Sequence, residues 1–365
     1  MQPTAPVSDM KNVECPNCGA SLSYQPGTTN LVCQYCGSSF EIHDEVPPQD
    51  AQKENDLMAA MSNSWKESQQ AQAFVVKCPA CGGEATMDPN LFSNACAFCG
   101  SPITVKPDTK AVANPQAVLP FKLERQAATD EFKKWLRKLW FAPNDLKKTA
   151  TQDRFNGMYL PFWTFDAATQ SAYQGDRGEH YYVTERRVVN GKEENVRVQK
   201  TRWYYVTGQV ARDFDDILIT ASRALSEKYL NKLEPWDLPN LVGYDNRYLS
   251  GFKAEVSQVN IQDGFKEAKQ VMTATIEQDV RRDIGGDEQR VRGVQTQFNA
   301  ATYKYILLPI WLSIYNYRNK IYRFVVNART GEVQGERPYS AIKIILAILL
   351  ALIILGILIY LFGNH

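Results

Sequence analysis

Residues 15–19 read Cys-Pro-Asn-Cys-Gly, and residues 33–38 read Cys-Gln-Tyr-Cys-Gly-Ser. Residues 78–82 (Cys-Pro-Ala-Cys-Gly) and 96–101 (Cys-Ala-Phe-Cys-Gly-Ser) follow the same pattern. Each cysteine of the later two motifs lies 63 positions after its equivalent in the first two, as from 15 to 78. A fixed offset at every cysteine indicates a duplicated module.

The chain has eight cysteines, and all of them belong to these motifs. A CxxC turn places two thiolates on one metal ion at about 2.3 Å, and two such turns complete a tetrahedron. Four sulfur ligands leave no position for water, so we expect two structural zinc sites in two zinc ribbons. The expected ligands are Cys15, Cys18, Cys33 and Cys36 in the first ribbon and Cys78, Cys81, Cys96 and Cys99 in the second.

Three other interpretations of the cysteines stay open. They are buried reduced thiols without metal, a redox-active CxxC pair, and an iron–sulfur centre. Thiolates that must stay free to bind a metal indicate a reducing compartment, so the N-terminal region is expected in the cytoplasm. Residues 1–13 contain no apolar run, and no secretory signal peptide is expected there.

Polar stretches divide the remainder of the chain. Residues 44–73 are rich in Gln, Asn, Ser and acidic residues, which predicts a solvated linker with some helix. Prolines between residues 101 and 116 indicate a second boundary. The expected domains are zinc ribbon 1 at 1–43, a polar linker at 44–73, zinc ribbon 2 at 74–106, a linker at 107–116, a cytoplasmic body at 117–340 and a transmembrane helix at 341–362.

The body begins with a helical pattern. Apolar residues recur at helical spacing from Ala128 to Trp140, with Lys and Arg on the other side. This pattern predicts an amphipathic helix that ends before Pro143. We interpret its apolar stripe as packed on the body, with an interfacial membrane helix or a partner-binding helix as alternatives.

Strand patterns dominate the rest of the body. Residues 158–210 are dense in Tyr, Trp, Val and Thr, and Asn190-Gly191 is a two-residue hairpin signal. The body is therefore expected to be α+β and rich in antiparallel sheet. Helices are predicted at about 221–233 and 261–284, strands at 303–314 and 321–326, and a turn at 329–331.

Two strand-like segments resemble each other. Leu160-Pro161-Phe162-Trp163 and Leu308-Pro309-Ile310-Trp311 share an order of residue types, which suggests two related sheet units. The alternative is that both are aromatic strand cores, with a proline at a sheet edge or at the start of a strand.

Residues 341–362 form an apolar run with one charge, Lys343. At 1.5 Å per residue the run is about 33 Å long as a helix, which matches a bilayer core. Arg323, Arg329 and Arg337 precede it and nothing basic follows, so the positive-inside rule predicts a tail anchor with residues 1–340 in the cytoplasm. We expect a single-pass protein of the cytoplasmic membrane.

The sequence contains no pattern that favours an enzyme. His43, His180 and His365 are the three histidines, and none lies in a catalytic pattern. The phosphate-binding motif GxxxxGK[ST] is absent. We therefore expect no catalytic and no cofactor-binding residues beyond the zinc ligands.

Charge separates two functions for the zinc ribbons. Residues 1–110 contain six basic and twelve acidic side chains, and each four-thiolate zinc centre adds more negative charge. Such a module repels a phosphate backbone, so protein recognition is favoured over nucleic acid. The body carries the positive excess, partly at 122–154, which suits an anionic membrane surface as well as DNA.

Several features together resemble a bacterial family of membrane-anchored double-zinc-ribbon proteins. They are the paired CPxCG and CxxCGS motifs, Leu119-Pro120-Phe121-Lys122, the Trp-containing helix and residues 157–165. Members are often labelled as related to primosomal replication factor Y, a helicase, but this chain lacks the phosphate-binding motif. The resemblance implies a link to flotillin-like (SPFH) and phage-shock envelope-stress systems, and so an adaptor that recruits scaffold proteins.

Three functions are therefore weighed. The first is a non-enzymatic, tail-anchored membrane adaptor whose zinc ribbons recognise cytoplasmic or membrane scaffold proteins. The second is a membrane-tethered, nucleic-acid-associated factor, whose binding would depend on salt. The third is an enzyme of unknown type, which would need a pocket with convergent polar groups in the body.

Overall fold

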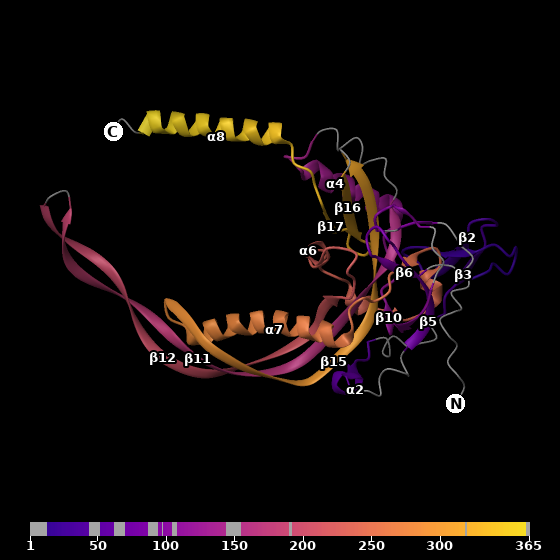
Figure 1. Cartoon of the computed structure of the whole chain (residues 1–365), viewed down its shortest axis with the longest axis horizontal. Coiled ribbons are helices and arrows are strands. Elements are labelled where there is room, and N and C mark those ends of the chain that lie inside the picture. The colour runs from indigo at the N-terminus through magenta and orange to yellow at the C-terminus, as the bar shows by residue number, and fades with distance from the viewer. Residues whose placement is uncertain are drawn as a thin grey trace.

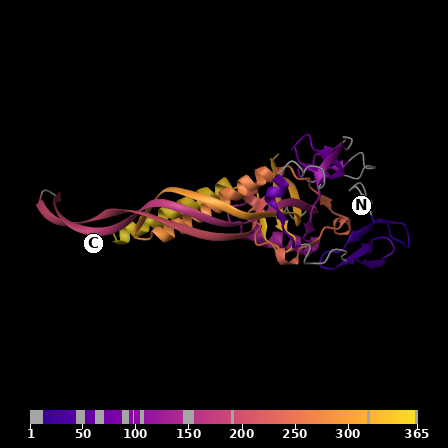
Figure 2. The ribbon, with the colours of Figure 1, turned by 90° about the horizontal axis from the view of Figure 1, so that it is seen from below.

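The computed structural model describes residues 13–43, 52–61, 70–86, 94–96, 98–103, 108–143, 155–189, 192–317 and 320–362. The chain is α+β with antiparallel sheets, as the sequence predicts. Two cysteine modules lie at one end of a central body, and a long curved extension leaves the other end (Figures 1 and 2).

The first cysteine module is a small antiparallel sheet. Its strands are β1 (Leu22–Tyr24), β2 (Asn30–Cys33) and β3 (Ser39–Glu41). The module packs on the body: Tyr24 N donates to Ser250 O and Gly27 N donates to Phe121 O, both at 2.9 Å. Leu22, Tyr24 and Leu31 share a core cluster with the body.

The second cysteine module is larger than its predicted range. It pairs β5 (Gln70–Lys77) with β6 (Glu84–Thr86) and β9 (Asp108–Ala113), and β7 (Asn94–Ala95) with β8 (Pro102–Ile103). Strands β5 and β9 thus extend into the segments that we predicted as linkers. Val76 and Phe98 join a second core cluster of the body, so this module also docks.

Part of the segment between the modules is folded as well. β4 (Asn55–Asp56) pairs with a body strand, with Asp56 opposite Thr302, and leads into α2 (Leu57–Met61). Leu57 is buried in a third core cluster. Residues 54–61 therefore pack on the body, although a helical turn at this place agrees with the sequence pattern.

Three long strands form the centre of the molecule. They are β11 (Asn156–Val189), β12 (Lys192–Thr220) and β15 (Glu288–Tyr317), in the order β12-β11-β15. At 3.3 Å per residue β11 spans about 110 Å. Val189 lies opposite Lys192, so β11 and β12 pair as a hairpin, and the predicted turn residues Asn190 and Gly191 themselves lie outside the described residues. We call the outer part of these strands, residues 167–189, 192–214 and 288–299, the arm.

The arm begins where all three strands carry an irregularity. The register shifts between Phe165 and Ala167 against β12, and between Asp166 and Ala168 against β15. Asp216 and Ala300, at the same level, have positive φ of 50° and 47°. Bulges add bend and twist to a sheet, and Figure 1 shows the sheet curving here.

Helix α7 (Ile261–Ile284) covers the inner, concave face of the arm (Figure 1). Its bounds match the predicted 261–284. Asn260 caps it by accepting from Asp263 N, and Gly285 ends it at a φ of 64°. Arg212 donates two hydrogen bonds to Asp279, so the helix is also fixed by charge. Its buried stripe is Ile261, Gly264, Phe265, Ala268, Met272, Ile276, Val280 and Ile284.

The two Leu-Pro segments lie side by side instead of in separate units. Leu160 pairs with Leu308, and Tyr159 pairs with Pro309. Each proline stands where its strand changes neighbour: β14 (Lys253–Ala254) gives way to β12 near Pro161, and β10 (Ala117–Val118) to β16 (Lys320–Asn327) near Pro309. A missing N–H is tolerated at such a break in the ladder.

The remaining elements surround this sheet. The predicted helix at 221–233 is wrong, because α6 (Glu227–Leu230) is a single turn. The amphipathic helix is α4 (Arg125–Lys138), with Ala128, Phe132 and Leu136 buried. The others are the 3-10 helices η3 (Leu238–Asn240) and η4 (Asn246–Leu249), and strands β13 (Val242–Gly243) and β17 (Val333–Gly335).

The chain ends in α8 (Ala341–Phe362), which projects from the body (Figure 1). In the part of the chain that the structure describes, it is the helix long and apolar enough to cross a membrane. Its apolar side chains are not covered by other elements.

Candidate metal centres

Each cysteine motif forms a tight turn that brings two sulfur atoms together. In the first module Gly19 N donates to Cys15 O (2.8 Å) and Gly37 N donates to Cys33 O (2.9 Å). Both glycines have positive φ, +74° and +75°, which strains a residue with a Cβ. The glycine after each motif is therefore required by the turn.

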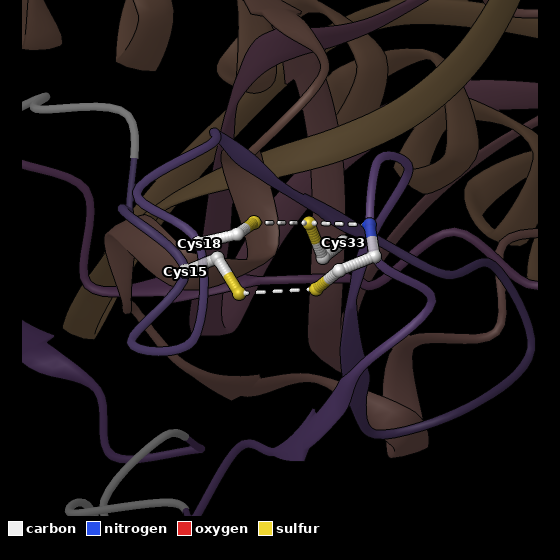
Figure 3. A group of neighbouring side chains, drawn as sticks. Cys15, Cys18 and Cys33 are labelled. Carbon is white, nitrogen blue, oxygen red and sulfur yellow. Dashed lines mark hydrogen bonds between the residues drawn. The ribbon is translucent and has the colours of Figure 1, made fainter.

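The four sulfur atoms of the first module lie within 4.8 Å of one another. Cys15 Sγ is 3.6 Å from Cys36 Sγ, and Cys18 Sγ is 3.5 Å from Cys33 Sγ (Figure 3). A disulfide needs about 2.05 Å. Four sulfurs at about 2.3 Å from one metal would stand roughly 3.8 Å apart. The cluster therefore fits a tetrahedral ion and does not fit disulfides.

The second module builds the same arrangement. Cys78 Sγ is 3.7 Å from Cys99 Sγ, and Cys81 Sγ is 3.7 Å from Cys96 Sγ. The eight cysteines predicted as ligands thus come together as two groups of four, each of which could bind zinc. Ligands of this kind and number would leave the ion closed to substrate.

A serine hydroxyl lies beside the last cysteine of each module. Ser38 Oγ is 3.2 Å from Cys36 Sγ, and Ser101 Oγ is 3.3 Å from Cys99 Sγ. Hydrogen bonds from Ser38 lower the pKa of Cys36 to about 6. Burial raises the pKa of Cys99, but its hydrogen bonds with Ser101 and neighbouring groups bring that pKa down to about 7. Because metals bind thiolate, both serines favour ligation.

The two modules differ in what their second turn presents. Tyr35 and Phe98 occupy equivalent positions, yet Tyr35 is 85% exposed and Phe98 is 1% exposed. Phe98 lies in the body core, and its carbonyl accepts from Arg323 Nε at 2.8 Å. The second module is therefore buried against the body by this turn, whereas the first points its turn and an aromatic ring into solvent.

A third polar cluster lies at the base of the arm. Oxygen atoms of Glu54, Asp166 and Asp215 lie within 4.8 Å of one another. Lys304, with 5% of its side chain exposed, lies 3.3 Å from Glu54 and 2.9 Å from Asp216. Burial and the Glu54 carboxyl raise the pKa of Asp166 to about 7. The negative charge of these carboxyl groups is thus balanced by Lys304 and by a proton shared between Glu54 and Asp166. The cluster also joins the segment between the two cysteine modules to the sheet.

The sequence did not predict this cluster, because its members come from distant parts of the chain.

The histidines lie away from catalytic patterns in the sequence. His180 lies on the arm, with Nε2 2.9 Å from Glu288 Oε1. His43 is exposed at the end of the first module, and His365 lies outside the described residues. Of the two histidines that the structure describes, neither belongs to a cysteine cluster.

Comparisons with known proteins show a similar protein, but the description of that protein names no function. No protein-family model matches the chain, and no solved structure matches it. The chain is 25% identical over 332 residues to YdjG of Bacillus subtilis (strain 168), which is described as an uncharacterized protein. The match covers 91% of this chain and 91% of that protein, so the likeness extends over most of the length of both.

Proposed function

We propose that the chain is a non-enzymatic adaptor, tail-anchored in the cytoplasmic membrane by α8, whose zinc ribbons recognise other proteins. The difference between Tyr35 and Phe98 is the observation that carries this proposal. The turns that contain Tyr35 and Phe98 each contribute two cysteines to a four-sulfur group. The turn with Phe98 docks on the body, whereas the turn with Tyr35 leaves its ring exposed. An exposed aromatic on a rigid turn suits a recognition surface.

The body supports this role by holding the first ribbon in a fixed position. Backbone hydrogen bonds to Phe121 and Ser250 join the ribbon to the body. A partner would therefore meet a preorganised surface and would lose less entropy on binding. The partners we propose are membrane or cytoplasmic scaffold proteins, of the SPFH or phage-shock type that the family resemblance implies.

A membrane-tethered nucleic-acid factor is the second candidate, and the arm favours it. Arg290 lies 3.7 Å from the ring centre of Trp203, and Arg197 lies 4.2 Å from that of Tyr182. Arginine and aromatic side chains alternate in many surfaces that bind single strands. Acidic residues such as Glu185, which pairs with Lys200 at 2.7 Å, reduce the positive field of the arm.

The test is capture of partners by the tagged full-length chain in mild detergent, followed by mass spectrometry. We compare wild type, Tyr35→Ser, the exposed arm variant Tyr182→Ser as a matched control, and Cys33→Ser/Cys96→Ser. The adaptor function predicts defined scaffold proteins that are retained by the control and lost from both other variants. Zinc content, measured on the same samples, should stay unchanged in Tyr35→Ser.

Nuclease treatment separates the two candidates. Partners that persist after nuclease and depend on Tyr35 support the adaptor. Enrichment of nucleic-acid proteins that disappears with nuclease or on Tyr182→Ser would overturn it in favour of the second function.

A further inference from the structure

An aromatic patch stands next to the start of α8. The segment after α4 exposes Trp140 (83%) and Phe141 (43%), and the segment before α8 exposes Tyr339 (58%). Sequence periodicity placed Trp140 on the packed side of the amphipathic helix, but α4 ends at Lys138. The Trp140 indole therefore lies outside the core, and the packing of the described residues gives no reason for a large aromatic ring at this exposed position.

Two hydrogen bonds fix this patch to the first turn of α8. Ser340 N donates to Phe141 O at 2.7 Å, and Lys343 Nζ donates to Ala142 O at 2.7 Å. Figure 1 shows α4 close to the start of α8. The aromatic rings thus stay at the level where the apolar helix begins.

The body holds α4 from its other side. Phe132 and Trp135 stack with centroids 6.1 Å apart, and Trp135 meets the ring of Phe324 at 5.2 Å. Trp135 is therefore a packed residue, whereas Trp140, five positions later, is not. The patch is presented by a rigid element.

Basic residues border the aromatic rings. Arg137 and Lys138 lie in the last turn of α4, and Arg337 lies over the ring of Tyr339 at 5.1 Å. Lys134 is paired within the helix with Glu131 at 2.7 Å. Aromatic side chains with a polar edge and basic residues are the types that gather at the boundary between a bilayer and the cytoplasm.

We propose that Trp140, Phe141 and Tyr339, with Arg137, Lys138 and Arg337, form an interfacial patch that binds the anionic headgroup region of the same bilayer that α8 crosses. This inference rests on the proposed membrane anchoring. Charge complementarity and the hydrogen-bonded link to α8 argue for lipid over a protein partner. The body would then be held at two points and oriented against the membrane.

The experiment uses the full-length chain in nanodiscs that contain phosphatidylglycerol, with or without lipids brominated on their acyl chains. Bromine quenches tryptophan emission at short range. Wild type should show a quenched component that Trp140→Phe removes by more than half. Trp203→Phe, on the arm, is the matched control and should keep the component. An unchanged component in Trp140→Phe would overturn the proposal.

The second part of the experiment tests the role of the basic residues. Arg137→Glu/Lys138→Glu should reduce the quenched component in phosphatidylglycerol nanodiscs to the level seen in nanodiscs of phosphatidylcholine alone. Equal quenching in both lipids for wild type would contradict an anionic partner. Resistance of the protein to extraction by alkaline carbonate tests α8 separately. Loss on extraction contradicts the membrane anchor itself, while retention without Trp140 quenching contradicts the patch alone.

Discussion

Ser38 and Ser101 place a hydroxyl beside one sulfur of each cluster. Groups that hydrogen-bond a ligand typically change metal affinity by roughly 10–100-fold. Ser38→Ala should therefore weaken zinc binding at the first site by about that factor, measured by competition with a chromophoric chelator. Ser39→Ala, at an exposed neighbour, is the control. Equal affinities for the two variants would show that the hydroxyl does not contribute.

Glu255 is the residue from which we expect a pH dependence. It is buried, and Ser222 Oγ donates to its Oε1 at 2.9 Å. Burial raises the pKa of Glu255 from 4.5 to about 8. Between these values the folded chain binds a proton that the unfolded chain releases, so the free energy of unfolding falls as pH rises.

Glu255→Gln should remove this loss of stability. Wild type is expected to lose on the order of a few kcal/mol between pH 5 and 9 through this group, and the variant should show a flatter profile. Denaturant titrations in detergent at several pH values measure both. Glu193→Gln, at the exposed end of the arm, should follow wild type. A variant with the wild-type slope would remove Glu255 as the cause.

At the scale of elements, the two second turns differ in their contribution to stability. Phe98 is buried in a core cluster, and replacing a buried Phe by a small residue typically costs about 3–5 kcal/mol. Tyr35 is exposed, and its replacement should change stability by no more than about 0.5 kcal/mol. Phe98→Ser and Tyr35→Ser form a matched pair for denaturant unfolding. Similar losses in both would contradict the different packing of the modules.

The base of the arm depends on one buried lysine. Lys304 lies between Glu54 and Asp216, and removing one partner of a buried ion pair typically costs about 3–5 kcal/mol. Lys304→Met should therefore lower the free energy of unfolding by that amount at pH 8. The loss should be smaller at pH 5, because Asp166, whose pKa burial and Glu54 raise to about 7, is then protonated and the cluster carries less negative charge.

The exposed Lys228→Met serves as the control for this substitution. Unfolding followed at both pH values would show whether the effect belongs to the buried group. A loss that is independent of pH would indicate a packing defect in place of the missing charge.

Sequence patterns predicted elements well where one face is buried throughout. Helix α7 has a continuous apolar stripe, so its bounds could be predicted, and spacing alone brought the eight cysteines together. The predicted helix at 221–233 was wrong because its leucines, Leu225, Leu230 and Leu233, are buried in a core cluster from a segment that forms a single helical turn. The lengths of β11, β12 and β15 were not predictable, since the arm is polar on the face away from α7.

At the scale of the whole molecule, composition predicted a series of modules, linkers, body and terminal helix, but it could not predict the contacts between these parts. Glu54, Asp166 and Lys304 meet only after three separate segments have folded. Docking of the cysteine modules likewise depends on single side chains such as Phe98, which spacing alone does not distinguish from Tyr35.

The arm and α8 leave the body toward the same side (Figure 1). A bilayer that held α8 at this angle would also hold part of the arm, whose strands carry charged residues such as Lys200 and Arg202 that hydrocarbon excludes. Insertion of α8 would therefore require the angle between the arm and α8 to change, and because Ser340 and Lys343 fix the start of α8 to Phe141 and Ala142, that change belongs to the base of the arm. The arm, roughly 75 Å long in β11, would then extend sideways beneath the membrane, away from the point where α8 is anchored. It would set how closely neighbouring molecules can be anchored.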